Sequence, residues 1–115
     1  MDLFDEPSEL AEKAGEEPDH TVQRYLELTC RVLPRMARDG ERDWPVRHDH
    51  CFQRIILDAV AGDVWYRHIA RPAYKHLTAA QAARAVALCQ DVMDGRADLH
   101  ALNRQSLRWR GKAGP

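Results

Sequence analysis

Apolar side chains recur at helical spacing in several stretches of this chain, and residue types that start or stop helices bound each stretch. The clearest stretch covers residues 79–94. Thr78 and Gln81 before it have the spacing of a capping box, and Gly95 after it is a typical C-terminal residue. Its buried face is expected to contain Ala82, Ala85, Val86, Cys89, Val92 and Met93.

Three other main helices are expected from the same periodicity. They cover residues 20–37, 49–61 and 98–109, and a short helix is expected over residues 63–69. In the first, Pro34 lacks a backbone N–H and is predicted to kink or break the last turn. In the second, Asp49 is the expected N-cap and Gly62 the expected stop.

No segment shows the sustained alternation of a β-strand, so the predicted class is all-α. The 115 residues are enough for one domain with one core. We therefore expect a compact bundle of four main helices plus one short helix, with residues 19–112 as the single helical domain.

Charge is distributed unevenly along the chain. Residues 1–20 contain eight acidic side chains and one Lys, whereas residues 21–115 contain sixteen basic and ten acidic side chains. Blocks of like charge are usually solvated and disordered, so residues 1–18 are expected to form a flexible acidic tail. Such a tail could also lie across the basic body and mask it.

Polar side chains placed in apolar arcs form the first candidate site. Asn103, Ser106 and Arg110 lie within the apolar arc of the last helix, and Arg54 and Asp58 lie one turn apart on residues 49–61. Polar groups aimed at a core must be hydrogen-bonded. If these helices pack together, Asp58 would accept from Arg110 or Asn103, giving either a structural network or a pocket for an anionic or amide-bearing ligand.

Basic and aromatic residues near the C-terminus form a second candidate. Arg104, Arg108 and Lys112 could neutralise phosphates, and Trp109 could stack on an unpaired base. A solvated helix end that favours cations would explain the same residues.

A third candidate is the run His48-Asp49-His50-Cys51, which is rich in potential metal ligands. Its spacing matches no standard zinc motif, so no metal site is predicted, although metal binding through His48, His50 and Cys51 stays open as an alternative. Cys51 beside two histidines could also be a reactive thiol. The simpler interpretation is that Cys30, Cys51 and Cys89 are buried thiols that act as small hydrophobic residues.

Three stretches resemble a small bacterial family of uncharacterised proteins whose members are often labelled GCN5-related acetyltransferases. They run from His50 to Asp58, from Arg71 to Lys75 and from Leu102 to Lys112. That label implies a mixed α/β sheet and a glycine-containing loop for the coenzyme A pyrophosphate, and neither pattern is found in this chain. The resemblance draws attention to Arg54, Asp58, Tyr74, Asn103 and Ser106 without assigning them roles.

The leading functional prediction is a non-catalytic cytoplasmic binding or regulatory module for an acidic partner, either nucleic acid or protein. The main alternative is a small-ligand protein or enzyme that uses the polar residues between the second and fourth main helices. No Gly-rich phosphate loop, HExxH or GxSxG motif occurs, so no cofactor is predicted and enzymatic activity is left undecided. No apolar run is long enough for a membrane span, and residues 1–20 lack the apolar region of a secretory signal.

Overall fold

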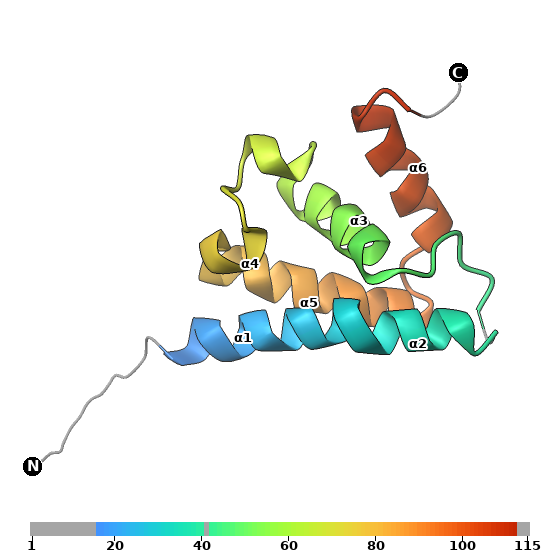
Figure 1. Cartoon of the computed structure of the whole chain (residues 1–115), viewed down its shortest axis with the longest axis horizontal. Coiled ribbons are helices and arrows are strands. Elements are labelled where there is room, and N and C mark those ends of the chain that lie inside the picture. Colours follow the sequence, from blue (N-terminus) through green and yellow to red (C-terminus); the bar gives the residue numbers. More distant parts are fainter. Residues whose placement is uncertain (1–15, 41, 113–115) are drawn as a thin grey trace, which may run out of the picture.

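The computed structural model describes residues 16–40 and 42–112, and in this part of the chain all regular structure is helical (Figure 1). The elements are α1 (Glu16–Glu27), α2 (Leu33–Arg38), α3 (Asp49–Ala61), α4 (Ala73–His76), α5 (Ala79–Asp94) and α6 (Leu99–Trp109), with a π-helical turn at Leu28–Val32 and a 3₁₀ turn at Trp65–Arg67. The predicted all-α class is confirmed. None of the described helices has the length and apolarity that a membrane crossing requires.

The first expected helix is a longer helical rod made of α1, the π-helical turn and α2. It begins at Glu16, earlier than expected, so it includes part of the sequence assigned to the acidic tail; residues 1–15 lie outside the described part. The predicted break at Pro34 is wrong. The Leu33 N–H donates to the Leu28 carbonyl and closes the wide turn directly before Pro34. Pro34 therefore falls in the first turn of α2, where a proline is tolerated.

Local signals place α3 and α5 at the predicted residues. The Thr78 side chain accepts from the Gln81 N–H, and the Gln81 side chain accepts from the Thr78 N–H, which confirms the capping box. Gly62 and Gly95 adopt the left-handed conformation, with φ of 73° and 81°, and end their helices as expected.

Two details of the helix ends differ from the prediction. The N-cap of α3 is His48, and Asp49 is the first helical residue. There its carboxylate interacts favourably with the positive end of the helix dipole. The expected short helix over residues 63–69 is only the 3₁₀ turn, and α4 follows it without having been predicted. The 3₁₀ turn and α4 both lack the repeated apolar spacing from which the helices were predicted.

The core forms where α3 packs against the rest of the molecule. The α1 helix lies along α5, while α3 packs on the π-helical turn, on α5 and on α6 (Figure 1). Phe52, Ile55 and Ile56 of α3 are fully buried. Trp44, from the loop before α3, meets the Phe52 ring edge to face at 5.8 Å and packs against the core.

Replacing Thr78 with Ala removes one of the two hydrogen bonds of the capping box on α5, the bond that the Thr78 hydroxyl accepts from the Gln81 N–H. We expect a loss of about 1 kcal/mol in the free energy of unfolding, measured by chemical denaturation. Gln90→Ala, an exposed change within the same helix, is the matched control and should stay within about 0.5 kcal/mol of the parent protein. Equal effects of the two changes would show that the capping box does not stabilise α5.

Candidate functional site

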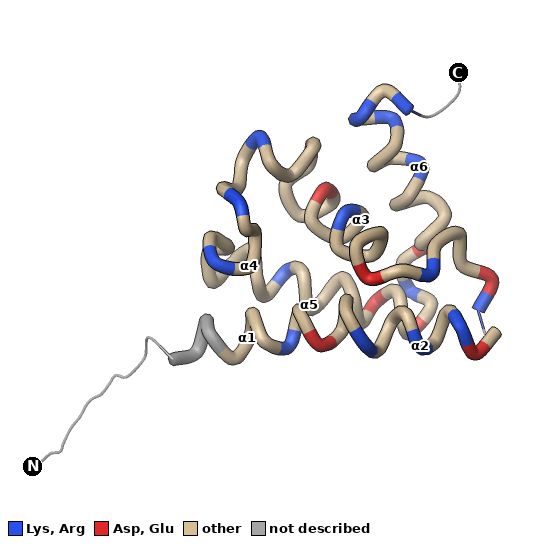
Figure 2. The backbone as a smooth tube through the Cα atoms, viewed as in Figure 1, with Lys and Arg blue, Asp and Glu red and all other residues tan. Residues whose placement is uncertain are grey.

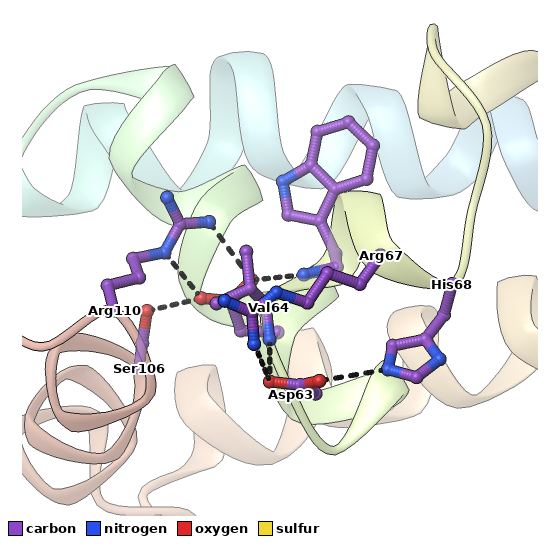
Figure 3. Close-up of polar contacts among 8 residues, drawn as sticks. Asp63, Val64, Arg67, His68, Ser106 and Arg110 are labelled. Atoms are coloured by element: carbon purple, nitrogen blue, oxygen red, sulfur yellow. Dashed lines mark hydrogen bonds and ion pairs between the residues drawn. The ribbon is translucent and has the colours of Figure 1, made fainter.

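The carboxylate of Asp58 is the centre of a buried polar network between α3 and α6. The residue is fully buried, with 0% of its surface exposed. Its Oδ2 accepts from the Ser106 hydroxyl at 2.6 Å and from Arg110 Nε at 2.8 Å. Its Oδ1 accepts from the Trp65 backbone N–H at 2.9 Å and from Arg110 Nη2 at 3.1 Å. Figure 3 shows the Ser106 and Arg110 side chains extending from the C-terminal end of α6, with dashed lines for their hydrogen bonds.

These bonds satisfy Asp58. A carboxylate offers about four acceptor positions, and this one accepts four hydrogen bonds. The hydrogen bonds to Asp58 also raise the pKa of Arg110, whose side chain is only 17% exposed. Asp58 therefore has a structural role: it fixes α6 and the Trp65 backbone, and its acceptor positions are occupied by the protein itself.

Arg54 joins the same network through Ser106. Its Nη1 donates to the Ser106 hydroxyl at 2.7 Å, and its Nη2 donates to Asn103 Oδ1 at 2.8 Å. The structure thus brings together the five residues predicted for the polar set. The expected bond between Asp58 and Arg110 is present, whereas Asn103 bonds to Arg54 instead of Asp58.

A cavity of about 640 Å³ opens beside this network. Arg54 and Arg110 line it, while Asp58, Asn103 and Ser106 lie outside its lining. Its other walls come from α1, from α3 and from residues 65–74. The cavity is therefore bounded by the network, and the two guanidinium groups are the part of the network that faces it.

The walls of the cavity combine cations with aromatic rings. The Arg71 guanidinium lies 4.5 Å from the Tyr66 ring centroid and 5.8 Å from that of Trp65, and the Arg110 guanidinium lies 5.5 Å from the Tyr66 centroid. Tyr74 adds a ring that is 44% exposed. None of the described residues that line the cavity is Asp or Glu. The wall chemistry therefore favours a negatively charged group attached to a flat or apolar body.

The residues predicted to bind nucleic acid lie on the far part of α6 and just beyond it. Arg104, Arg108 and Lys112 are exposed, and Trp109 is half-buried. Figure 2 shows Lys or Arg positions on every labelled helix, so basic charge is spread over the described body. A nucleic-acid interface at these four residues stays a prediction.

The run His48-Asp49-His50-Cys51 at the start of α3 does not assemble into a ligand set. The rings of His48 and His50 stack with centroids 5.7 Å apart. Within residues 16–40 and 42–112, no three His, Cys, Asp or Glu side chains come together as a group that could hold a metal ion. Elsewhere, His68 Nε2 lies 3.0 Å from Asp63 Oδ2, and this hydrogen bond lowers the pKa of Asp63 (Figure 3).

The three cysteines have three different environments, so the expectation of buried thiols is confirmed for Cys89 and wrong for Cys30. Cys89 is buried, Cys51 is half-buried and Cys30 is exposed. Cys30 lies in the π-helical turn, off the face that buries Leu28 and Thr29, and its sulfur accepts from Gln53 Nε2 at 3.2 Å. Burial raises the pKa of the Cys89 thiol to about 12.

No family model matches this chain, and neither curated proteins nor solved structures give a match. The resemblance to proteins labelled GCN5-related acetyltransferases therefore stays a prediction. The site has to be interpreted from its own geometry.

The residues of the polar network could be predicted from the sequence, whereas most residues that line the cavity could not. Arg54 and Arg110 were recognised because they interrupt or border apolar helical faces. The wall formed by Trp65, Tyr66 and Arg71 lies in a segment without helical periodicity. The sequence feature that points to this wall is the occurrence of both aromatic and basic residues over positions 65–75, because cationic side chains and aromatic rings attract one another.

Replacing Asp58 with Asn leaves Arg110 without its buried charge partner. We expect the free energy of unfolding to fall by about 3 kcal/mol, because breaking one side of a buried ion pair leaves an uncompensated charge. Denaturant unfolding monitored by circular dichroism measures the change. The control is Asp94→Asn, an exposed carboxylate near Arg96, for which about 0.5 kcal/mol or less is expected. A small effect at Asp58 would contradict its central role.

The environments of the cysteines predict a difference in thiol reactivity. At pH 8 the native Cys89 thiol is almost entirely protonated because its pKa is about 12, and only the thiolate is a good nucleophile. Iodoacetamide should therefore modify exposed Cys30 at least about a hundredfold faster than Cys89, as measured by peptide mass spectrometry. In denaturant the two rates should converge. Similar rates in the native protein would contradict the burial of Cys89.

Proposed function

We propose that this chain is a non-catalytic binding protein for a small molecule that joins an anionic group to an aromatic or apolar body. The observation that carries the proposal is the convergence of Arg54, Arg71 and Arg110 on one cavity whose described lining contains no carboxylate. This proposal combines the non-catalytic role of the leading sequence prediction with the small ligand of its alternative, and it replaces the nucleic-acid or protein partner of the leading prediction with a small anionic molecule.

The charge balance around the cavity favours an anion. Asp58 neutralises Arg110 through two hydrogen bonds, and the same carboxylate reaches Arg54 only through the Ser106 hydroxyl. Two guanidinium groups therefore share one carboxylate, and Arg71 adds a third cation. Guanidinium groups bind carboxylate and phosphate oxygens in paired geometry, so an anionic group is the natural complement.

The dimensions and the aromatic wall favour a small molecule with a flat body. A volume of about 640 Å³ falls within the range of about 300–1,000 Å³ that small-ligand sites occupy. Trp65, Tyr66 and Tyr74 supply ring faces, and Leu57 supplies apolar contact. Such walls bury the body of a ligand while the guanidinium groups orient its charged end.

A binding role without catalysis is supported by the state of Asp58. A general base needs a free acceptor position within reach of substrate. Asp58 is fully buried, and its four acceptor positions are used by Ser106, Arg110 and the Trp65 N–H. The remaining charged groups of the network are arginines, which stay protonated and suit recognition better than proton transfer.

Phenyl phosphate is a suitable probe, with phenol as the neutral comparison. In a titration followed by ¹H–¹⁵N NMR, phenyl phosphate should shift the Trp65 indole signal and the amides of residues 65–74. Removing one charged donor by Arg71→Ala should weaken its binding about tenfold. Arg67→Ala is the matched control, because Arg67 is exposed, pairs with Asp63 and lies outside the cavity lining.

The proposal fails if phenyl phosphate causes no saturable shifts at these positions, or if phenol binds as tightly as phenyl phosphate. It also fails if Arg67→Ala weakens binding as much as Arg71→Ala, because the effect would then reflect overall charge and not the cavity.

A further inference from the structure

Two different kinds of contact hold the two halves of α6. Leu99 is 2% exposed and belongs to the core cluster, and Leu102 packs against the same cluster. Beyond Leu102, the described contacts that tie α6 to α3 are polar: Ser106 and Arg110 bond to Asp58, and Ser106 and Asn103 bond to Arg54. The first half of α6 is thus held by apolar burial together with a contact between the His100 ring and the Asp43 carbonyl oxygen, whereas the network ties the second half to α3.

Arg110 belongs to the network and to the cavity wall at the same time. It follows directly after α6 as the C-cap residue, its Nε and Nη2 donate to Asp58, and its side chain lines the cavity. A guanidinium has five N–H donors, and these two bonds leave three for another acceptor. Arg110 can therefore bind an anion in the cavity without releasing Asp58.

Arg54 depends on α6 for its orientation. Its hydrogen-bond partners Asn103 and Ser106 are both on α6, although Arg54 itself belongs to α3 and lines the cavity. When the second half of α6 is docked, two cavity cations are in place. When it is undocked, Arg110 leaves the wall and Arg54 loses the groups that position it.

We infer that occupancy of the cavity by an anion and docking of the second half of α6 on α3 are coupled, each favouring the other. A ligand shifts a conformational equilibrium only by its difference in affinity for the two states. Here the difference comes from Arg110, which contributes to the cavity only in the docked state, and from Arg54, which is oriented only in that state. Because coupling is reciprocal, docking of α6 raises anion affinity by the same factor.

Electrostatics acts in the same direction. The docked network holds the guanidinium groups of Arg54 and Arg110 against the single carboxylate of Asp58. An anion in the cavity compensates the excess positive charge and removes a cost of docking. This coupling rests on the proposed function, because it requires that the cavity take an anion.

Hydrogen–deuterium exchange on the full chain tests the coupling. With saturating phenyl phosphate, the amides of residues 104–110 should exchange at least about fivefold more slowly than in the free protein, since opening of this half requires loss of the bound anion. The amides of residues 85–88, in the middle of α5, serve as the internal reference and should be unchanged. Phenol should leave both regions unchanged.

A pair of variants assigns the effect to the shared guanidinium. Arg110→Met should reduce the probe-dependent slowing in residues 104–110 at least about twofold, because only the link through Arg54 to Asn103 and Ser106 remains, while binding through Arg54 and Arg71 persists with lower affinity. Arg108→Met, an exposed change on the same helix, should keep the slowing. Exchange of the free variants is measured alongside, so a helix that is already open without the probe is recognised directly.

The outcomes separate the two proposals. Saturable binding of phenyl phosphate without slower exchange in residues 104–110 would overturn the coupling and leave the proposed function standing. Slowing that is as large in Arg110→Met as in the parent protein would also overturn it, because the coupling would then not depend on Arg110. Absence of any saturable binding would overturn the proposed function and the coupling together.

Discussion

Burial of the Asp58 carboxylate is the constraint on which the rest of the structure depends. Removing a charge from water is costly unless it is paired and hydrogen-bonded, and Asp58 is fully buried. Its four hydrogen bonds come from two separate segments: the 3₁₀ turn through Trp65, and α6 with its C-cap through Ser106 and Arg110. The network therefore fixes the relative positions of α3, α6 and the chain that leads to α4.

The same residues connect the fold to a site. A network that served packing alone would be complete with one cation for its one carboxylate. Here Arg54 enters as a second cation, bonded to neutral oxygens of Asn103 and Ser106, and both arginines line a cavity with aromatic walls. Arg54 and Arg110 with one buried carboxylate between them leave an excess of positive charge at the cavity, and this local excess is the physical basis for proposing an anion there.

The sequence predicted those parts of the molecule that local chemistry determines. The bounds of α3 and α5 followed from glycine stops, a capping box and apolar periodicity, since each of these acts within a few residues. The network was predictable because Ser106 lay in an apolar arc where an unpaired hydroxyl would lose free energy. The cavity was not predictable, because its wall at Trp65, Tyr66 and Arg71 is positioned by contacts with distant segments and not by its own periodicity. The exposure of Cys30 was not predictable from helical periodicity, because Cys30 lies beside the apolar stripe of its helix but within the π-helical turn.

The π-helical turn that separates α1 from α2 allows one helical rod to pack against two different neighbours. An α-helix presents its faces with a single phase, and a π turn inserts one additional residue and shifts that phase. Before the turn the rod packs along α5, whereas the turn itself and α2 pack against α3. Loss of one residue between Tyr25 and Leu33 would turn one half of the rod by about 100° relative to the other. A continuous α-helix of identical composition could then direct its apolar face towards only one of these two neighbours. The extra residue of the π turn therefore makes this segment a junction between two packing layers.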